Sequence, residues 1–277
     1  MKLSLSVRIA EAPCKTRLNV PFREIVQLAA ESRYHALCMR ASAGGVQTPR
    51  DRLEAMGRKV KEAGLVVSMV TADFDVPLNN ADGPNSLRDI GPSLDVAEAL
   101  GCDLIRICMK SRDDVEYARR AADQAAERRI RLAHQCHTNS LFEQVERSLE
   151  VLGQVGRPNF GLIYEPANLM LCGEPYAVET LRRFQPYLMN VYVQNHVLDP
   201  DGPVELKTRS LGPRRFRHLP LWESGGVDFK RVMASLDEIG YNRFFTVHHA
   251  QNTKTIEDAR EYAGNCAEWF RKYFPEG

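Results

Sequence analysis

The feature of this sequence that most constrains its fold is a strict alternation of short apolar segments with longer amphipathic ones. Each apolar segment has six to nine residues and is bounded by polar residues, Gly or Pro, which is typical of a β-strand. The segments between them carry helix signals, such as Thr48 and Pro49 before one predicted helix and Gly64 after it. The eight predicted strands are 2–7, 35–40, 65–73, 102–110, 129–137, 159–167, 188–196 and 244–250.

Eight β-then-α units imply a parallel sheet, and eight units in 277 residues match a single-domain (β/α)₈ barrel spanning 1–277. The alternative is an open doubly wound sheet, which usually has a Gly-rich turn after its first strand. Here that segment reads IAEAPCKTRLNV and has no glycine. The one long irregular stretch, 197–227 after the seventh strand, predicts a functional loop such as a lid.

Charge and composition narrow the classes of protein. Lys plus Arg is 37 and Asp plus Glu is 36, so a net charge of +1 argues against a nucleic-acid partner. No run of 18 apolar residues predicts a membrane span. Seven cysteines without a CxxC pair, and an N-terminus unlike a signal peptide, indicate a reduced cytoplasmic protein. A homo-oligomer stays open.

Histidines gather where a barrel of this kind has its active site, at the C-terminal ends of the strands. Five of the seven fall at the predicted ends of strands five, seven and eight: His134, His137, His196, His248 and His249. A lone histidine there is more often structural than a ligand. Several on adjacent strands, together with a carboxylate, suit a divalent metal.

The alternation of side chains along a strand selects the ligands. One residue from each of four consecutive strands gives a predicted metal site of His134, Glu165, Gln194 and His248. On strand seven, Tyr192, His196 or water are alternatives to Gln194.

At these residues the chain resembles the xylose isomerase-like TIM barrels, a group of sugar phosphate isomerases, ketose 3-epimerases, inosose dehydratases and endonuclease IV. The resemblance covers nearly the whole chain. It is strongest in LAHQCHTNSLFEQVERSLEVLGQVGRPNFGLIYEPANL and PLWESGGVDFKRVMASLDEIGYNRFFTVHH. It implies one divalent metal, held in the sugar-active branch by Glu, Asp, His or Gln, and Glu on strands five to eight. The favoured metal is Mn²⁺, with Zn²⁺, Co²⁺ or Mg²⁺ as alternatives.

Mapped onto this chain, the two family glutamates become His134 and His248, the aspartate becomes Glu165, and the histidine three residues later becomes Asn168. A metal-bound imidazole cannot act as a base through the same nitrogen, so the resemblance leaves the base to other residues. The candidates for this catalytic base are His137, His196 and His249. We expect Asn168, Arg106, Lys110 and Glu223 to bind substrate.

The sequence therefore predicts a metal-dependent sugar isomerase or epimerase that removes a proton beside a metal-polarised carbonyl or hydroxyl. The alternatives are a carbohydrate lyase, either a dehydratase or an enzyme eliminating from a 3-oxo-glycoside, and a non-catalytic sugar-binding barrel. The net charge and the thin ligand set disfavour an endonuclease. The expected partner is a small carbohydrate, with no nucleic acid and no membrane.

Overall fold

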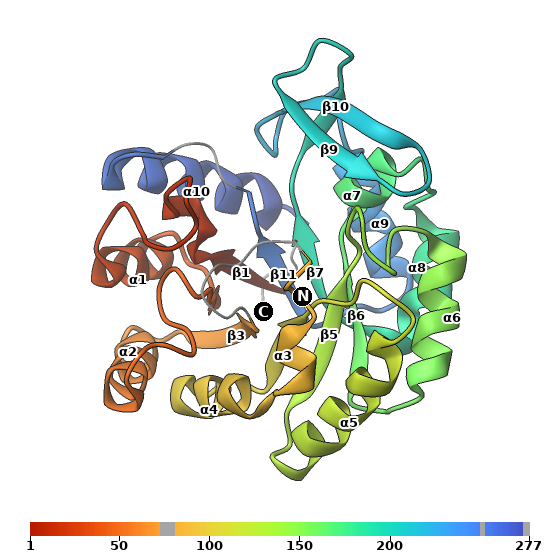
Figure 1. Cartoon of the computed structure of the whole chain (residues 1–277). Helices are drawn as coiled ribbons and strands as arrows, with labels where there is room; N and C mark the ends of the chain where they lie inside the picture. The colour runs from red at the N-terminus through yellow and green to blue at the C-terminus, as the bar shows by residue number, and fades with distance from the viewer. Residues whose placement is uncertain (73–80, 250–252, 274–277) are drawn as a thin grey trace.

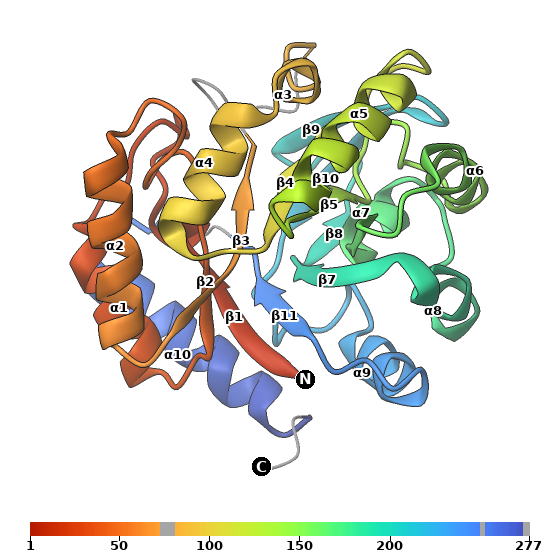
Figure 2. The same ribbon diagram turned by 90° about the horizontal axis from the view of Figure 1, so that it is seen from below.

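The computed structural model describes residues 1–72, 81–249 and 253–273, and its centre is a closed barrel of eight parallel strands. Neighbours pair in the order β1-β11-β7-β6-β5-β4-β3-β2 (Figures 1 and 2). Every strand lies inside a predicted segment, so the (β/α)₈ prediction is confirmed; the predicted strand ends at Asp73 and Ala250 lie outside the described residues. The strands are β1 (Lys2–Ser6), β2 (Ala36–Cys38), β3 (Val66–Thr71), β4 (Leu104–Ile107), β5 (Arg131–Gln135), β6 (Phe160–Tyr164), β7 (Leu188–Val193) and β11 (Phe244–Val247).

Helices connect the strands and cover the outside of the barrel (Figure 2). Local signals set their ends: Thr255 and Asp258 form a capping box at the start of α10, and Gly101 ends α4 with φ +68°. The helices are η1 (Val7–Ala10), α1 (Phe22–Glu31), α2 (Arg50–Glu62), α3 (Asn85–Arg88), α4 (Gly91–Leu100), α5 (Asp114–Glu127), α6 (Val145–Val155), α7 (Pro166–Leu171), α8 (Val178–Phe184), η2 (Gln185–Tyr187), α9 (Phe229–Glu238) and α10 (Ile256–Arg271).

Side chains of the barrel strands alternate between two cores. The core inside the barrel consists of Cys38, Met69, Leu104, Ala133, Ile163, Met189 and Tyr192. The residues between them, such as Leu132 and Leu162, pack outward against the helices. Both faces of each strand are therefore buried. The alternation between inward and outward side chains decides which residues at the strand ends point into the mouth of the barrel.

The stretch 197–227 is not the irregular loop that we predicted. Most of it forms a three-stranded antiparallel sheet in the order β8-β10-β9, from β8 (His196–Leu198), β9 (Val204–Thr208) and β10 (Gly212–His218), which projects from the barrel (Figure 1). The Glu143 carboxylate, in the loop after β5, accepts hydrogen bonds from the backbone N–H groups of Arg209 (2.9 Å) and Ser210 (2.8 Å). The β9–β10 turn is therefore attached to the loop after β5, and the β8–β10 sheet forms a fixed wall beside the barrel.

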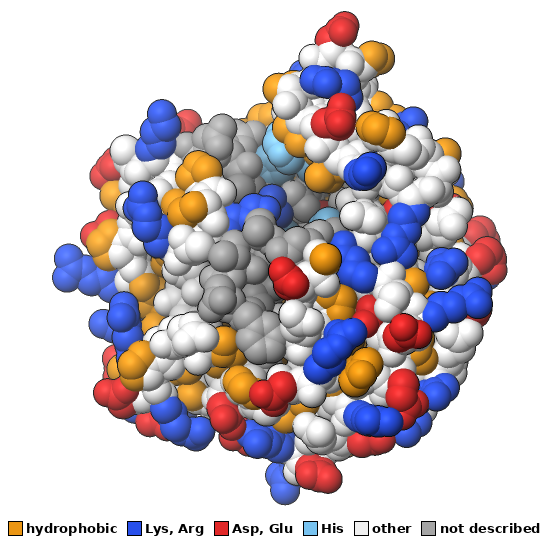
Figure 3. All heavy atoms as spheres, in the orientation of Figure 1, with side chains coloured by type: hydrophobic (Ala, Val, Ile, Leu, Met, Phe, Trp, Pro, Cys, Tyr) orange, Lys and Arg blue, Asp and Glu red, His pale blue; other side chains and the backbone are white. Residues whose placement is uncertain are grey.

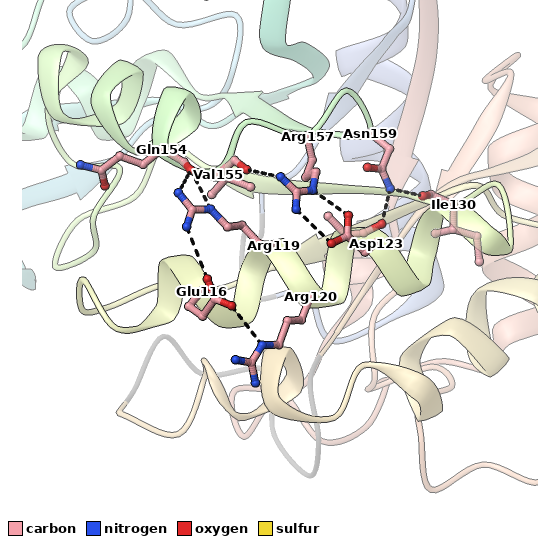
Figure 4. Close-up of polar contacts among 10 residues, drawn as sticks. Glu116, Arg119, Arg120, Asp123, Ile130, Gln154, Val155, Arg157 and Asn159 are labelled. Atoms are coloured by element: carbon pink, nitrogen blue, oxygen red, sulfur yellow. Dashed lines mark hydrogen bonds and ion pairs between the residues drawn. The ribbon is translucent and has the colours of Figure 1, made fainter.

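Away from the mouth, arginines on α5 and beside α6 are paired with neighbours at the surface (Figure 4). Arg157 binds Asp123 at 2.6 Å, and Arg119 donates to the backbone carbonyl of Gln154 at 2.9 Å. Glu116 accepts from Arg120 at 3.1 Å. These contacts join neighbouring β/α units through exposed side chains.

Among the helices in the described parts of the chain, none combines the length and the apolar character needed to cross a membrane.

Candidate active site

The mouth of the barrel is lined by inward-facing residues that continue the inner core past the strand ends. Each lies two positions beyond an inward-facing residue, as Glu165 lies beyond Ile163 and Arg106 beyond Leu104. On β1 the chain passes into η1, which carries Arg8. We call these residues the mouth ring: Arg8, Arg40, Thr71, Arg106, Gln135, Glu165, Gln194 and His248.

Glu165 is the carboxylate of the mouth ring and is fully buried. Its oxygens accept hydrogen bonds from the amides of Gln135 and Gln194, and from Asn168 Nδ2 at 2.9 Å. Burial raises the pKa of Glu165 to about 7, against the lowering effect of the Gln135 and Gln194 hydrogen bonds and of the nearby Arg8. This carboxyl group can thus both take up and release a proton near neutral pH.

His248 lies on the inner face of the ring. Its ring stacks on Tyr192 with 3.9 Å between centroids, and its Nδ1 is 3.1 Å from Ser6 Oγ. Burial, with a further contribution from Arg8, holds the pKa of His248 well below its usual value. The imidazole is therefore neutral at physiological pH.

Three arginines belong to the mouth ring, and their partners differ. Arg40 Nε donates to Glu11 Oε1 at 2.9 Å, and both side chains are only 3% exposed. Within 1–72, 81–249 and 253–273, the side chains of Arg8 and Arg106 form no hydrogen bond or ion pair, and Arg106 Nε is buried. Burial and the nearby Arg40 lower the pKa of Arg8 to about 10. Among the described residues of the mouth ring, three arginines thus accompany one carboxylate. Figure 3 shows basic and histidine side chains together in the hollow beside the β8–β10 sheet.

His134, predicted as a metal ligand, does not join Glu165. It shares a face with Leu132 as expected, but that face packs outward, and the His134 ring stacks on Phe142 at 4.1 Å. Its Nδ1 lies 2.6 Å from the backbone oxygen of Gln135. The neighbouring Gln135 occupies the inward position on β5 instead, so the predicted phase of this strand is off by one residue.

Within the described residues, none of the three histidines predicted as catalytic bases forms a hydrogen bond with Glu165. His196 on β8 and His218 on β10 have their Nδ1 atoms 3.1 Å apart, and the ring centroids of His218 and His249 are 5.2 Å apart. His196, His218 and His249 therefore form a cluster at one end of the β8–β10 sheet. Both ring nitrogens of His249 are buried and have no hydrogen-bond partner among the described residues. His137 lies in the loop after β5, where burial and Arg106 lower its pKa to about 3.

The predicted substrate-binding residues divide into two pairs. Asn168 and Arg106 lie at the mouth, where Asn168 binds Glu165 and Arg106 is part of the ring. Lys110 Nζ donates to the backbone oxygen of Asn139 at 2.6 Å. The Glu223 side chain is exposed, and its backbone oxygen accepts from Asn195. Lys110 and Glu223 are thus peripheral to Glu165.

The mouth ring does not fit the expected divalent metal. Its one carboxylate, Glu165, is enclosed by amide N–H donors and lies near two guanidinium groups, whereas a divalent ion needs converging anionic or imidazole donors. In the part of the chain that the structure describes, no three His, Cys, Asp or Glu residues are placed to hold a metal. A further double charge beside Arg8 and Arg106 would be repelled.

Sequence reasoning missed Gln135, Arg8 and Arg40 in this site. Gln135 directly follows His134, so choosing the other face of β5 would have found it. Arg8 and Arg40 end the apolar segments KLSLSVR and HALCMR. A charged residue at the C-terminal end of a predicted barrel strand could have indicated that both lie at the mouth. Arginine is not a metal ligand, so a predicted metal site includes neither Arg8 nor Arg40.

The closed parallel barrel defines a TIM barrel, and its polar ring lies at the C-terminal ends of the strands, where TIM-barrel enzymes have their active sites. Residues 26–273 match the model of the xylose isomerase-like TIM barrel family, and the chain belongs to that family. No curated protein sequence matches it.

Solved structures of the same fold include the probable 3-DHS dehydratase AsbF from Bacillus anthracis, with 17% identity, 98% of this chain and 99% of that one covered, and a TM-score of 0.72. D-Allulose 3-epimerase from Methylomonas sp., in complex with D-allulose, has 16% identity, coverages of 99% and 97%, and a TM-score of 0.72. IolI protein with a bound zinc atom has 15% identity, full coverage of both chains and a TM-score of 0.72. At these identities the likeness establishes the fold.

Proposed function

We propose that this protein is a carbohydrate isomerase or epimerase that moves a proton at a carbon next to a carbonyl group, with Glu165 as the base. The observation that carries the proposal is the buried Glu165 carboxyl group, whose pKa of about 7 matches the needs of reversible proton transfer at neutral pH. Its position at the mouth of a TIM barrel is where such a group meets substrate.

The surroundings of Glu165 support this role. The amides of Gln135, Gln194 and Asn168 hold the carboxylate in one orientation, so little reorganisation precedes proton transfer. Loss of a proton beside a carbonyl places negative charge on the carbonyl oxygen. The guanidinium groups of Arg8 and Arg106 lie near Glu165 and would stabilise that charge.

His248 supplies a second group for proton transfer. It lies on β11, whereas Glu165 lies on β6, with β7 between them in the barrel. A neutral imidazole can donate through one nitrogen and accept through the other. Return of the proton to a different carbon gives isomerisation, and return to the opposite face gives epimerisation; His248 is the group we assign to that return.

The family and its structural neighbours support a carbohydrate substrate: an epimerase bound to D-allulose and a dehydratase share the fold. A divalent ion such as Mn²⁺ is not part of the proposal, because the donor set at the mouth does not fit one. The substrate we propose is a small carbohydrate.

The test is proton exchange in D₂O, followed by NMR, across a panel of ketoses, aldoses and their sugar acids. We expect deuterium at the carbon beside the carbonyl of a turned-over sugar, and a rate at least about 100-fold lower in Glu165→Gln. The value of kcat/KM should fall as the pH drops below about 7, because the base must be ionised. Glu150→Gln, an exposed carboxylate on α6, is the matched control and should keep full activity.

Two results would contradict the proposal. Undiminished exchange in Glu165→Gln would remove Glu165 as the base. An unsaturated or anhydro product without a rearranged sugar would show a lyase instead, in which the carbanion expels a leaving group. Addition of Mn²⁺ after chelator treatment provides a further check, because we expect it to leave the rate unchanged.

A further inference from the structure

Within the described residues, the arginines at the mouth are in excess over the carboxylates beside them, and two of the three have no carboxylate partner. Arg40, Arg106, Glu11 and Glu165 all act on the charge of Arg8, so these groups lie near one another. Charged groups inside a protein are normally paired, since an unpaired buried charge is costly. The excess is therefore a feature that the fold alone does not explain.

The guanidinium groups of Arg8 and Arg106 have no carboxylate partner within the described residues. Glu11 accepts from Arg40 at 2.9 Å and from Ser42 Oγ at 2.6 Å, so it is committed to that side of the mouth. Glu165 accepts from three amides. Neither carboxylate forms an ion pair with Arg8 or Arg106 in the described ranges.

Several polar side-chain atoms of the mouth ring, on the neighbouring strands β3, β4 and β5, have no hydrogen-bond partner within the described residues. Within the part of the chain that the structure describes, three of them are buried without a hydrogen-bond partner: Thr71 Oγ1, Arg106 Nε and Gln135 Oε1. They come from β3, β4 and β5, which are neighbours in the barrel, and the Thr71 and Gln135 side chains are at least nine-tenths buried. Buried polar atoms of this kind are rare unless a ligand or water satisfies them.

Arg8 is also open to a cavity. A hollow of about 440 Å³ is lined by Arg8, Lys15, Asn19 and Lys254, with Glu11 on its wall. That volume is in the range of small-molecule sites. Arg8 thus lines this cavity and is also near enough to Glu165 to feel its charge, so a ligand in the cavity can reach Arg8.

We infer that Arg8 and Arg106 bind a carboxylate of the substrate, so that the substrate is a sugar acid rather than a neutral sugar. Guanidinium groups match a carboxylate with paired N–H donors. Both arginines lie close enough to Glu165 to act on its charge, which puts the bound anion near the reacting carbon. A carboxylate bonded to the carbonyl carbon, as in 2-ketogluconate, would lie that near. This inference rests on the proposed function and names its substrate class.

The experiment measures binding rather than turnover, by calorimetry at low ionic strength. The probes are gluconate, glucuronate and 2-ketogluconate, with the neutral polyol glucitol and inorganic phosphate as comparisons. We expect at least one sugar acid to bind at least tenfold more tightly than glucitol and phosphate, and less tightly as salt is added. Arg8→Gln and Arg106→Gln should each lose at least tenfold in affinity. Arg157→Gln, a surface arginine, should bind like the wild type.

The Tm of the ligand-free arginine variants distinguishes a binding role of Arg8 and Arg106 from a structural one. Removing one of two like charges that lack a partner should raise the Tm of the ligand-free protein, whereas removing a structural arginine should lower it. Glu165→Gln separates the two proposals, because it should bind the acid and fail to turn it over. The inference is overturned if no sugar acid binds, if glucitol or phosphate binds as tightly, or if both arginine variants keep full affinity.

Discussion

The same residue type does two different things in two regions of this molecule. At the surface between α5 and α6, the side chains of Arg119 and Arg157 are 39% and 37% exposed, and both have hydrogen-bond or ion-pair partners (Figure 4). At the mouth, Arg8 and Arg106 have none in the described ranges. Exposed pairs gain little because water screens them. Charges that stay unpaired inside a barrel cost stability, which points to a role in binding.

The largest effect we predict is at the buried pair within the mouth. Glu11→Gln removes the carboxylate that pairs with Arg40 in a site where both side chains are 3% exposed. We expect a loss of about 3–5 kcal/mol in the free energy of unfolding, measured by urea denaturation. The double variant Glu11→Gln/Arg40→Met removes both charges and should recover much of that loss. A loss in Glu11→Gln below about 1 kcal/mol would make this pair equivalent to the surface pairs.

An intermediate effect concerns pH and Glu165. Burial raises the pKa of Glu165 from its ordinary 4.5 to about 7, so the folded protein holds this proton more tightly than the unfolded chain does. The resulting stability is present below pH 4.5 and is lost as the pH rises through 7. Between pH 5 and pH 8 the stability of the wild type relative to Glu165→Gln should fall by about 2–3 kcal/mol. A difference that does not change with pH would contradict this.

The smallest effect is expected at the surface. Arg157→Gln breaks the 2.6 Å contact with Asp123, but both side chains are exposed and the backbone contacts of α5 and α6 persist. We expect the Tm of this variant to equal that of the wild type within error in a thermal melt, at both low and high salt. A clear drop in Tm would show that the surface arginines contribute as much as the buried pair.

The barrel could be predicted from the sequence because its period is explicit: eight apolar segments recur with helices between them, and each became a strand. The phase of β5 could not. His134 and Gln135 end a strand that is buried on both faces, and such a strand gives no polar face from which to count. The β8–β10 sheet was missed because its strands contain few apolar residues: β10 reads GPRRFRH, and Phe216 is its one buried residue.

The sequence could predict where these side chains lie in the barrel, whereas their roles stay predictions. Glu165, Gln194 and His248 all lie at the mouth, as their positions at strand ends suggested. Reading them as metal ligands depended on His134 converging with them. The contribution of Arg8 depends on η1, which turns the chain inward directly after β1, and a strand pattern alone does not contain that turn.

The attachment of the β8–β10 sheet through Glu143 also bears on how related proteins can diverge. The contact joins segments about 70 residues apart, so the wall beside the mouth is braced by two β/α units at once. Changes in the length of the hairpin can then alter how large a molecule fits beside Glu165, while the eight strands and their polar ring stay as they are. Substrate size and reaction chemistry can thus evolve separately on this scaffold.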